Sequence, residues 1–226
     1  MNRKRPIVAI DGPVGAGKST VARALARALG FGYLNTGAMY RAVAVAARAA
    51  GIDPDSPTAI AQLQKILATL SITFNGERVL LDGHDISDVI SDPVIGDLAS
   101  RFSAIAIVRD KMRDLQRAAG REGGVVMEGR DIGTAIFPDA EVKFFLVADV
   151  AVRAARRYAE LAQKGVATTL EEVAEQLEER DRRDAERAIA PLRRADDAIV
   201  IDSTGRGVKA VVNEMKTRVE AVSRAI

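Results

Sequence analysis

A glycine-rich segment near the start of the chain limits the possible folds more than any other feature of this sequence. It reads Gly12-Pro13-Val14-Gly15-Ala16-Gly17-Lys18-Ser19 and fits the pattern G-x-x-x-x-G-K-[ST] at every fixed position. Glycines let backbone N–H groups curl around phosphate oxygens, and a following helix adds N–H groups and a positive dipole end. The motif therefore predicts a buried strand before it and a helix after it. The alternative is a glycine-rich turn with an accidental lysine.

The motif also assigns tasks to its side chains. We expect the Lys18 ammonium to reach the β- and γ-phosphates of a nucleotide and the Ser19 hydroxyl to be a ligand of Mg²⁺. The expected nucleotide-binding residues are Gly12, Pro13, Val14, Gly15, Ala16, Gly17, Lys18, Ser19 and Thr20.

Nucleotide binding alone leaves the reaction open. A GTPase would need the sequence Asn-Lys-x-Asp, and none of the asparagines is followed by lysine. No run of four apolar residues ends in an Asp-Glu pair suited to hydrolysis. These observations favour transfer of a phosphoryl group to a second substrate.

Hydrophobic patterning predicts an α/β fold. Short apolar runs at 7–10, 124–128, 142–147 and 199–202 have the pattern of buried strands, and helical stretches flank each of them. Strands that alternate with helices indicate a parallel sheet covered on both faces. The predicted helices include 18–29, 37–50 and 170–190, and helical patterns also occur from about 93 to 119.

One stretch breaks this alternation. The turn dipeptides Asn75-Gly76 and Asp82-Gly83 separate short β-like runs and predict a small antiparallel meander. We therefore expect an insert at 62–103 and a core domain made of 1–61 and 104–226. No apolar run is long enough for a signal peptide or a membrane span, so we expect a cytoplasmic protein.

The amino-acid composition excludes several kinds of catalytic and binding site. The 226 residues include no cysteine and one histidine, His84, which excludes a thiolate nucleophile and a Cys- or His-pair metal site. The net charge of +2, the few aromatic residues and the absence of tryptophan argue against a nucleic-acid binder. Arginine nevertheless outnumbers lysine 25 to 8. Genomic base composition is one cause, and the use of Arg as a bidentate phosphate ligand is the other.

Several arginines lie where phosphates would need them. In the predicted helix 170–190, Arg180, Arg183, Asp184 and Arg187 share one face, and a second cluster follows the strand 142–147 at Arg153, Arg156 and Arg157. Together they predict a mobile lid at about 153–187 that covers phosphates. The alternative is a solvated helix whose glutamates at 171–179 pair with the arginines.

Other candidates lie at strand and helix ends. Arg130 and Asp131 follow a predicted strand, where ligands of open α/β sheets bind, although a structural Arg–Asp pair is the alternative. Thr36 can cap the next helix, and Arg41 could reach an incoming phosphate. We expect His84 to be a surface loop residue.

Taken together, these segments resemble the bacterial cytidylate kinase family, within the nucleoside monophosphate kinase group of P-loop proteins. Individually only the phosphate loop is a general motif, whereas the G-R-D-I-G-T and R-D-x-R-D segments are specific as a set. The matching stretches are 10–18, 36–41, 128–134, 137–140, 180–184, 190–192 and 202–204.

The resemblance implies a three-layer P-loop fold with a five-stranded parallel sheet, an NMP-binding insert with short antiparallel strands, and a helical lid. It implies in-line phosphoryl transfer from ATP to CMP or dCMP with Mg²⁺, by a monomer that acts on small molecules. The CMP contacts that it implies are Thr36, Arg41, Ser100, Arg109, Arg130, Asp131, Arg180, Asp184 and Arg187.

The resemblance also implies individual roles. Ser100 would read the cytosine edge, with Arg109 and Asp131 facing the base. Arg41 and Arg130 would hold the acceptor phosphate, and Arg180 and Asp184 would meet the ribose. The expected catalytic residues are Lys18, Arg41, Arg130 and Arg183, and the expected further ATP contacts are Arg156 and Arg157.

Two positions depart from the familiar pattern. Thr36 stands where serine is usual, and Ser19 stands where some members have glycine. Rival interpretations are a kinase of the same fold for UMP, dTMP, shikimate or dephospho-coenzyme A, and a nucleotide-gated binding protein without transferase activity.

Overall fold

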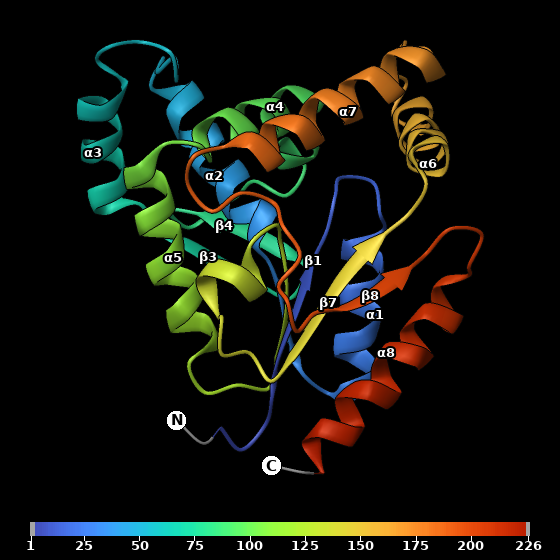
Figure 1. Cartoon of the computed structure of the whole chain (residues 1–226). Helices are drawn as coiled ribbons and strands as arrows, with labels where there is room; N and C mark the ends of the chain where they lie inside the picture. The colour runs from blue at the N-terminus through green and yellow to red at the C-terminus, as the bar shows by residue number, and fades with distance from the viewer. Residues whose placement is uncertain (1–2, 225–226) are drawn as a thin grey trace. The chain divides into compact units, whose positions relative to one another are not determined.

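The computed structural model describes residues 3–224, which form two compact units. The core unit comprises the chain up to Leu34 and from Ala119 onward, and the inserted unit comprises Asn35–Ala118 (Figure 1). The inserted unit starts before the predicted insert of 62–103 and ends after it. No helix in the described part of the chain is long and apolar enough to cross a membrane.

The core unit contains a five-stranded sheet in the order β2-β6-β1-β7-β8. Its strands are β1 (Ile7–Asp11), β2 (Gly32–Asn35), β6 (Val125–Glu128), β7 (Val142–Val147) and β8 (Ile199–Asp202). β1 pairs in parallel with β6 and β7, and β7 pairs in parallel with β8. All four predicted strands are confirmed to within one residue, but β8 is not the buried strand expected: it lies at the edge of the sheet, and only Ile201 in it is buried. The sequence patterns did not reveal β2, because four residues that begin with glycine at a sheet edge give only a weak signal.

β1 carries an unbroken apolar run because both of its faces are covered. Every residue of β1 is buried, as expected for a central parallel strand. The helices α1 (Lys18–Leu29) and α8 (Val208–Ser223) pack against each other and cover one side of the sheet (Figure 1). The predicted helix 18–29 is confirmed, and it stops at Gly30, whose φ of 62° suits glycine.

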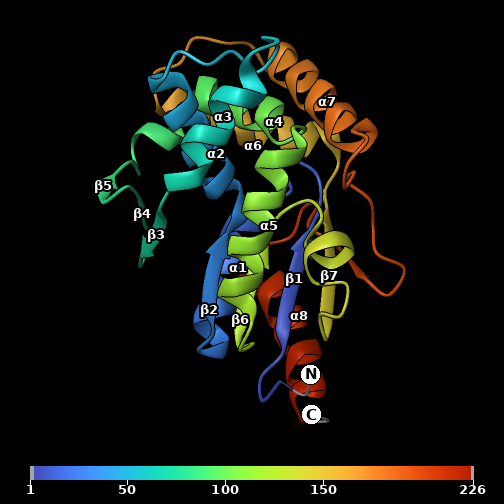
Figure 2. The same ribbon diagram turned by 90° about the vertical axis from the view of Figure 1, so that its left-hand side faces the viewer.

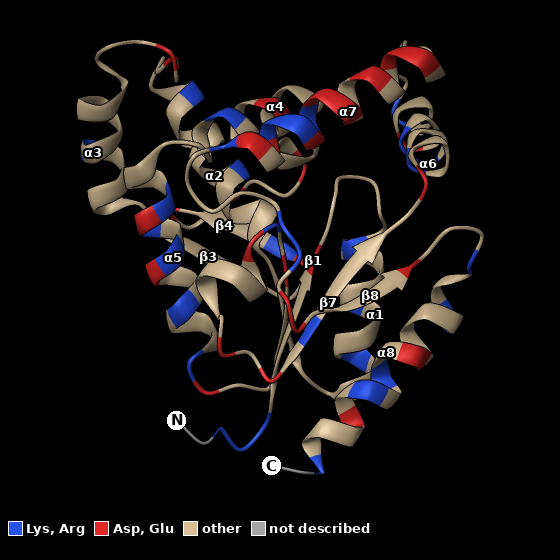
Figure 3. Cartoon of the chain, viewed as in Figure 1, with Lys and Arg blue, Asp and Glu red and all other residues tan. Residues whose placement is uncertain are grey.

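Two further helices of the core unit, α6 (Val150–Gln163) and α7 (Leu170–Glu186), pack against each other around their own apolar cluster. Thr169 and Glu172 form a capping box at the start of α7. Acidic residues dominate the first half of α7 and basic residues gather toward its end (Figure 3). We call this pair of helices the lid.

The prediction that α7 extends to Ala190 is wrong. The helix ends at Glu186, where Leu192 N–H of the following turn donates to the helix carbonyl Asp184 O at 2.7 Å. Within the turn itself, Arg187 Nε donates to Ala190 O at 2.7 Å. Ala190 then adopts a φ of 48°. Arg187 therefore sits at the C-cap and not within the helix.

The inserted unit combines helices with a small sheet. Its helices are α2 (Thr36–Ala49), α3 (Ala59–Thr69), α4 (Pro93–Phe102), α5 (Ala106–Gly120, whose last two residues belong to the core unit) and the short 3₁₀ turn η1 (Val89–Ser91). The strands β3 (Ile72–Asn75), β4 (Arg78–Leu81) and β5 (His84–Asp85) form an antiparallel sheet next to α2 (Figure 2). The predicted meander is confirmed, and His84 is exposed as expected.

The helical pattern predicted over about 93–119 is confirmed as two helices, because the chain breaks between α4 and α5. At the break the Ser103 hydroxyl donates to Ser100 O at 2.7 Å, a local bond of the kind that competes with helix continuation. The Ser103 carbonyl accepts from Arg109 Nη1 at 3.1 Å. The interruption therefore brings the start of α5 back toward the end of α4.

Alanine substitutions at Gly123 and Gly205 separate two effects on stability, that of steric crowding and that of backbone conformation. Gly123 and Gly205 both have positive φ, 72° and 63°, but a Cβ on Gly123 would lie 2.1 Å from Arg5 O whereas a Cβ on Gly205 would meet nothing within 4 Å. We expect Gly205→Ala to lower the free energy of unfolding by about 1 kcal/mol, and Gly123→Ala to lower it by at least about 2 kcal/mol more, since the backbone must also shift. Urea denaturation of both variants tests this, and equal losses would contradict it.

Candidate active site

The phosphate loop lies between β1 and α1, as the motif requires. Two of its positions require glycine. A Cβ on Gly12, which has a φ of 148°, would lie 2.1 Å from Leu146 O. Gly17 is the N-cap of α1 and has a left-handed backbone conformation. Gly15 also has a positive φ of 76°. The strand–loop–helix context of the motif is therefore confirmed.

Lys18 is buried at the first position of α1, with 7% of its surface exposed. Its ammonium donates to Pro13 O across the loop at 2.6 Å. Burial lowers the pKa of Lys18, and the neighbouring charge of Arg130 lowers it further, whereas Glu128, Asp11 and Asp184 act in the opposite direction. Lys18 thus belongs to one cluster of charged side chains at the carboxyl ends of β1 and β6.

Glu128 ends β6 and links three elements of the core unit. Its two carboxylate oxygens accept from the Ser19 hydroxyl at 2.9 Å and from the Tyr33 hydroxyl at 2.5 Å. Burial raises the pKa of Tyr33, and the charge of Glu128 raises it further. The sequence analysis gave Glu128 no role, although an acidic residue directly after the apolar run 125–127 and opposite β1 was the available signal.

The oxygen donors at this place suit Mg²⁺. Ser19 is solvent-exposed, and its hydroxyl lies within hydrogen-bond distance of the buried Glu128 carboxylate. Mg²⁺ prefers hard oxygen ligands and keeps several waters, so it needs only one or two protein groups beside phosphates. Among the described residues no group of three or more His, Cys, Asp or Glu could hold a metal by itself.

Asp11 connects the phosphate loop to the Gly129-Arg130-Asp131 segment. Its carboxylate accepts from Ile132 N and Gly133 N at 2.9 and 2.8 Å, at the start of the single π-helical turn η2 (Ile132–Ile136). Burial raises the pKa of Asp11 to about 6, although these two hydrogen bonds oppose the rise. The residue before the loop therefore sets the direction in which the chain leaves Asp131.

Two ion pairs connect this segment to α7. Arg130 Nε contacts Asp184 Oδ2 at 2.8 Å, and Arg187 Nη2 contacts Asp131 Oδ1 at 3.1 Å. Burial alone would raise the pKa of the Asp184 carboxyl, but the charge and hydrogen bond of Arg130, together with the charges of Arg180 and Arg187, outweigh it and hold the pKa below its ordinary value. The predicted residues Arg130, Asp131, Asp184 and Arg187 therefore lie together. Arg180, one turn before Asp184, is half-buried and adds its charge to the same carboxyl.

The lid arginines Arg156, Arg157 and Arg183 have different hydrogen-bond and ion-pair partners. Arg156 donates to Ser203 Oγ and Ser203 O at 3.1 and 2.9 Å, and Ser203 Oγ donates to Ala16 O of the phosphate loop at 3.0 Å. Arg157 contacts Glu160 on the surface of its own helix. Arg183 lies 3.9 Å from Glu179, which is the helical pairing that the sequence left open as an alternative. Of the three, Arg156 is the one held beside the phosphate loop.

The inserted unit carries the remaining predicted residues. Thr36 is buried at the first position of α2, but it does not cap the helix, since Asn35 Oδ1 accepts from Ala38 N at 3.0 Å. Arg41 Nη1 donates to Ile90 O at 2.7 Å. The Ser100 hydroxyl is buried and has no hydrogen-bond partner within the described residues. Arg109 is buried over the Tyr40 ring.

Asp11 makes stability depend on pH. Its folded-state pKa of about 6 exceeds the ordinary 3.8, so folding favours the neutral carboxyl. The corresponding stabilisation is complete below pH 3.8 and is lost as the pH rises through 6, a change of about 3 kcal/mol. Asp11→Asn cannot titrate, so its free energy of unfolding relative to wild type should rise over this window. Urea denaturation between pH 4 and 7.5 measures the difference, and parallel pH profiles would contradict the assignment.

Comparisons with known proteins agree with this geometry. A family model described as cytidylate kinase matches residues 8–221. A cytidylate kinase of Geobacter sulfurreducens is 50% identical over 224 residues, 99% of this chain and 96% of the relative. A cytidylate kinase of Chlorobaculum tepidum is 45% identical over 216 residues, 94% of this chain and 92% of the relative.

A solved structure adds a likeness of fold alone. An uncharacterised protein from Eubacterium ventriosum matches with a TM-score of 0.54 at 12% identity, covering 96% of this chain and 99% of that protein. The loop, the strand-end charges and the full-length sequence matches lead to one conclusion. The chain belongs to the cytidylate kinase family of phosphotransferases.

Proposed function

We propose that this protein transfers the γ-phosphoryl group of ATP directly to CMP or dCMP, with Mg²⁺, and so forms CDP or dCDP. The observation that carries the proposal is the placing of two cations, Lys18 and Arg130, in one buried charged cluster at the end of the phosphate loop. A phosphoryl group in transfer spreads negative charge over its oxygens, and preorganised cations stabilise it.

The acceptor is itself a phosphate, which simplifies the chemistry. Its attacking oxygen is already anionic, so no side chain has to remove a proton. The residues have to hold two polyanions in line and neutralise their charge. Lys18 and the backbone N–H groups of the loop bind the donor phosphates, and Arg156 binds ATP beside them. Arg157 and Arg183, on the lid helices, are proposed to contact ATP and the transferring group.

Ser19 holds Mg²⁺ in this proposal, with Glu128 oriented toward the same place by its hydrogen bond to Ser19. When bound, the ion would neutralise charge on the donor phosphates. Glu128 meanwhile accepts from the Ser19 hydroxyl and from Tyr33, so the ligand oxygen is positioned by a carboxylate that Tyr33 holds in place.

We assign the acceptor nucleotide to two sets of residues. On the inserted unit, Ser100 and Arg109 recognise the cytosine, while Thr36 and Arg41 bind the rest of the nucleotide. The buried, unpartnered hydroxyl of Ser100 supports this, since buried polar groups normally have partners. On the core unit, the assigned contacts are Arg130, Asp131, Arg180, Asp184 and Arg187.

The proposal extends to the setting of the reaction. We propose a monomer that acts in the cytoplasm on small-molecule substrates, without nucleic acid or membrane partners. Gel filtration tests the oligomeric state.

A panel of acceptors tests the activity. ADP release, coupled to a second enzyme, should depend on CMP or dCMP and be much weaker with UMP, dTMP, shikimate or dephospho-coenzyme A. Lys18→Ala should reduce turnover by about a thousandfold, because a preorganised cation is lost. ATP binding without acceptor-dependent ADP release would contradict the proposal, as would a fully active Lys18→Ala.

Ser100→Ala tests the recognition of the base. We expect the KM for CMP to rise by about tenfold, the loss expected for a hydrogen bond to a buried group. The KM for ATP should stay nearly constant, because Ser100 is not assigned to the donor. Steady-state kinetics with each substrate varied in turn measure the two effects, and an equal loss for both would argue against base recognition.

A further inference from the structure

The tip of the phosphate loop is bound by two charged lid side chains. Val14 N–H donates to Asp181 Oδ1 at 3.1 Å, and Arg153 Nη1 donates to Val14 O at 2.9 Å. Arg153 Nη1 also contacts the second oxygen of Asp181. The three residues therefore form a closed ring that satisfies both backbone polar groups of Val14.

The side chain of Val14 belongs to the same attachment. It packs against the apolar cluster of the lid, formed by Ala154, Leu161, Val173 and Leu177. The next residue, Gly15, lies so close to α6 that an added Cβ would be 3.1 Å from the Arg153 Cβ. One residue of a phosphate loop is thus part of the hydrophobic core of the lid.

Burial distinguishes Asp181 and Arg153 from the surface charges of the lid. Arg153 is only 5% exposed, and its Nε also donates to Ala148 O at 3.1 Å, which holds the guanidinium at the base of α6. The Asp181 side chain is 20% exposed, against 47% for Glu179 in a surface pair of α7. A desolvated charge pair that also holds backbone groups has a defined geometry, unlike an exposed pair.

We propose that Asp181 and Arg153 are positioning residues for the donor nucleotide: together they clamp the tip of the phosphate loop at Val14 and so hold the other N–H groups of the loop in the arrangement that binds ATP. The inference rests on the proposed use of ATP and deepens it. Neither side chain is assigned a contact with the phosphates. They act through the loop, and the acceptor nucleotide is unaffected by them.

The clamp predicts a selective loss of donor binding in Asp181→Asn. The amide keeps one oxygen for Val14 N–H but loses the charge that holds Arg153. We expect the dissociation constant of a non-hydrolysable ATP analogue, measured by calorimetry without acceptor, to rise by about tenfold, the coupling typical of a buried charged contact. The KM for ATP should rise in parallel, while the KM for CMP stays within about twofold.

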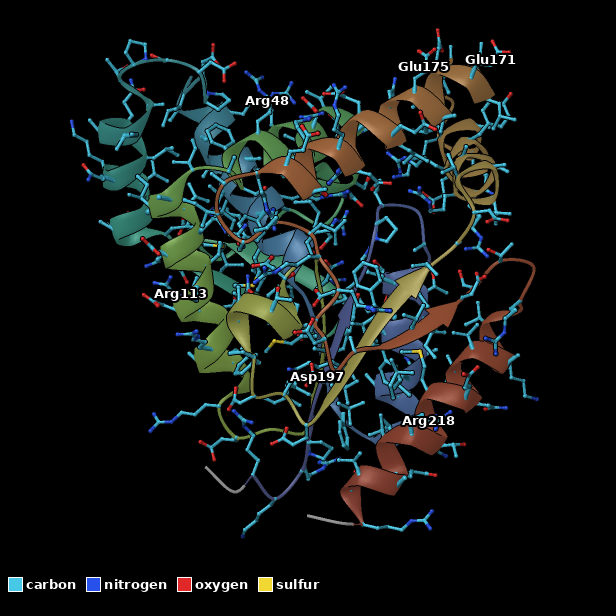
Figure 4. All side chains as sticks on the ribbon, viewed as in Figure 1. Arg48, Arg113, Glu171, Glu175, Asp197 and Arg218 are labelled. Atoms are coloured by element: carbon cyan, nitrogen blue, oxygen red, sulfur yellow. The ribbon has the colours of Figure 1, made fainter. Side chains whose placement is uncertain are left out.

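Matched variants separate positioning from folding. Glu175→Gln removes a carboxylate from the exposed outer edge of the same helix and should leave ATP binding unchanged (Figure 4). Asp181→Glu keeps the charge and should recover part of the affinity. Arg153→Lys should weaken ATP binding as Asp181→Asn does, and the double variant should lose little more than either single variant. The thermal unfolding midpoint of each variant shows whether the fold is intact.

The outcomes are distinct. Unchanged or tighter ATP binding in a folded Asp181→Asn would overturn the clamp, and tighter binding would show that Asp181 competes with phosphate. Equal losses for ATP and CMP would also overturn it. A wild-type protein that binds no ATP analogue would refute the proposed function itself.

Discussion

Buried charge has to be matched by opposite charge or by hydrogen bonds, and the core unit buries several charged side chains at the carboxyl ends of β1 and β6. Lys18, Glu128 and Asp11 each find different partners there: the loop carbonyl of Pro13, the hydroxyls of Ser19 and Tyr33, and the N–H groups that open η2. The elements that supply these partners are thereby held in register with the loop. These contacts hold the elements around the phosphate loop in place, and the loop's glycines allow its positive φ angles.

The same constraint extends to the lid. Arg130 and Asp131, just beyond β6, are paired with Asp184 and Arg187 at the end of α7. The early end of α7 matters here, because it allows Arg187 to leave the helix and turn toward Asp131. The lid is thus joined to the rest of the core unit twice, to the segment after β6 through these ion pairs and to the phosphate loop through the contacts of Val14. Both the proposed acceptor contacts and the proposed donor loop therefore depend on how α7 is held.

Much of the fold could be predicted from the sequence, because the strands, helix ends and turns depend on local signals. Strand 142–147 is apolar except for Lys143, strand 199–202 begins with three apolar residues, and α1 stops at a glycine. The turn dipeptides separate the strands of the antiparallel meander. Helix ends escaped the sequence patterns where contacts of side chains and turns override local preference. Ser103 uses its hydroxyl and carbonyl to interrupt a helical pattern, and the turn after Arg187 ends α7 before Pro191 does. β2 escaped notice because it is short and pairs with a distant segment.

The sequence by itself determined the strand–loop–helix context of a phosphate-binding motif, since glycines, Lys18 and Ser19 at fixed spacing are typical of that context. It also identified the arginine-rich segments, because their order along the chain is specific to one family. Only the tertiary structure decided which charges meet. Glu128 with Ser19, Asp11 with η2, and Asp181 with Val14 are separated by 109, 121 and 167 positions. Partners so far apart leave no periodic signal, and they come together only when the sheet and the lid bury them.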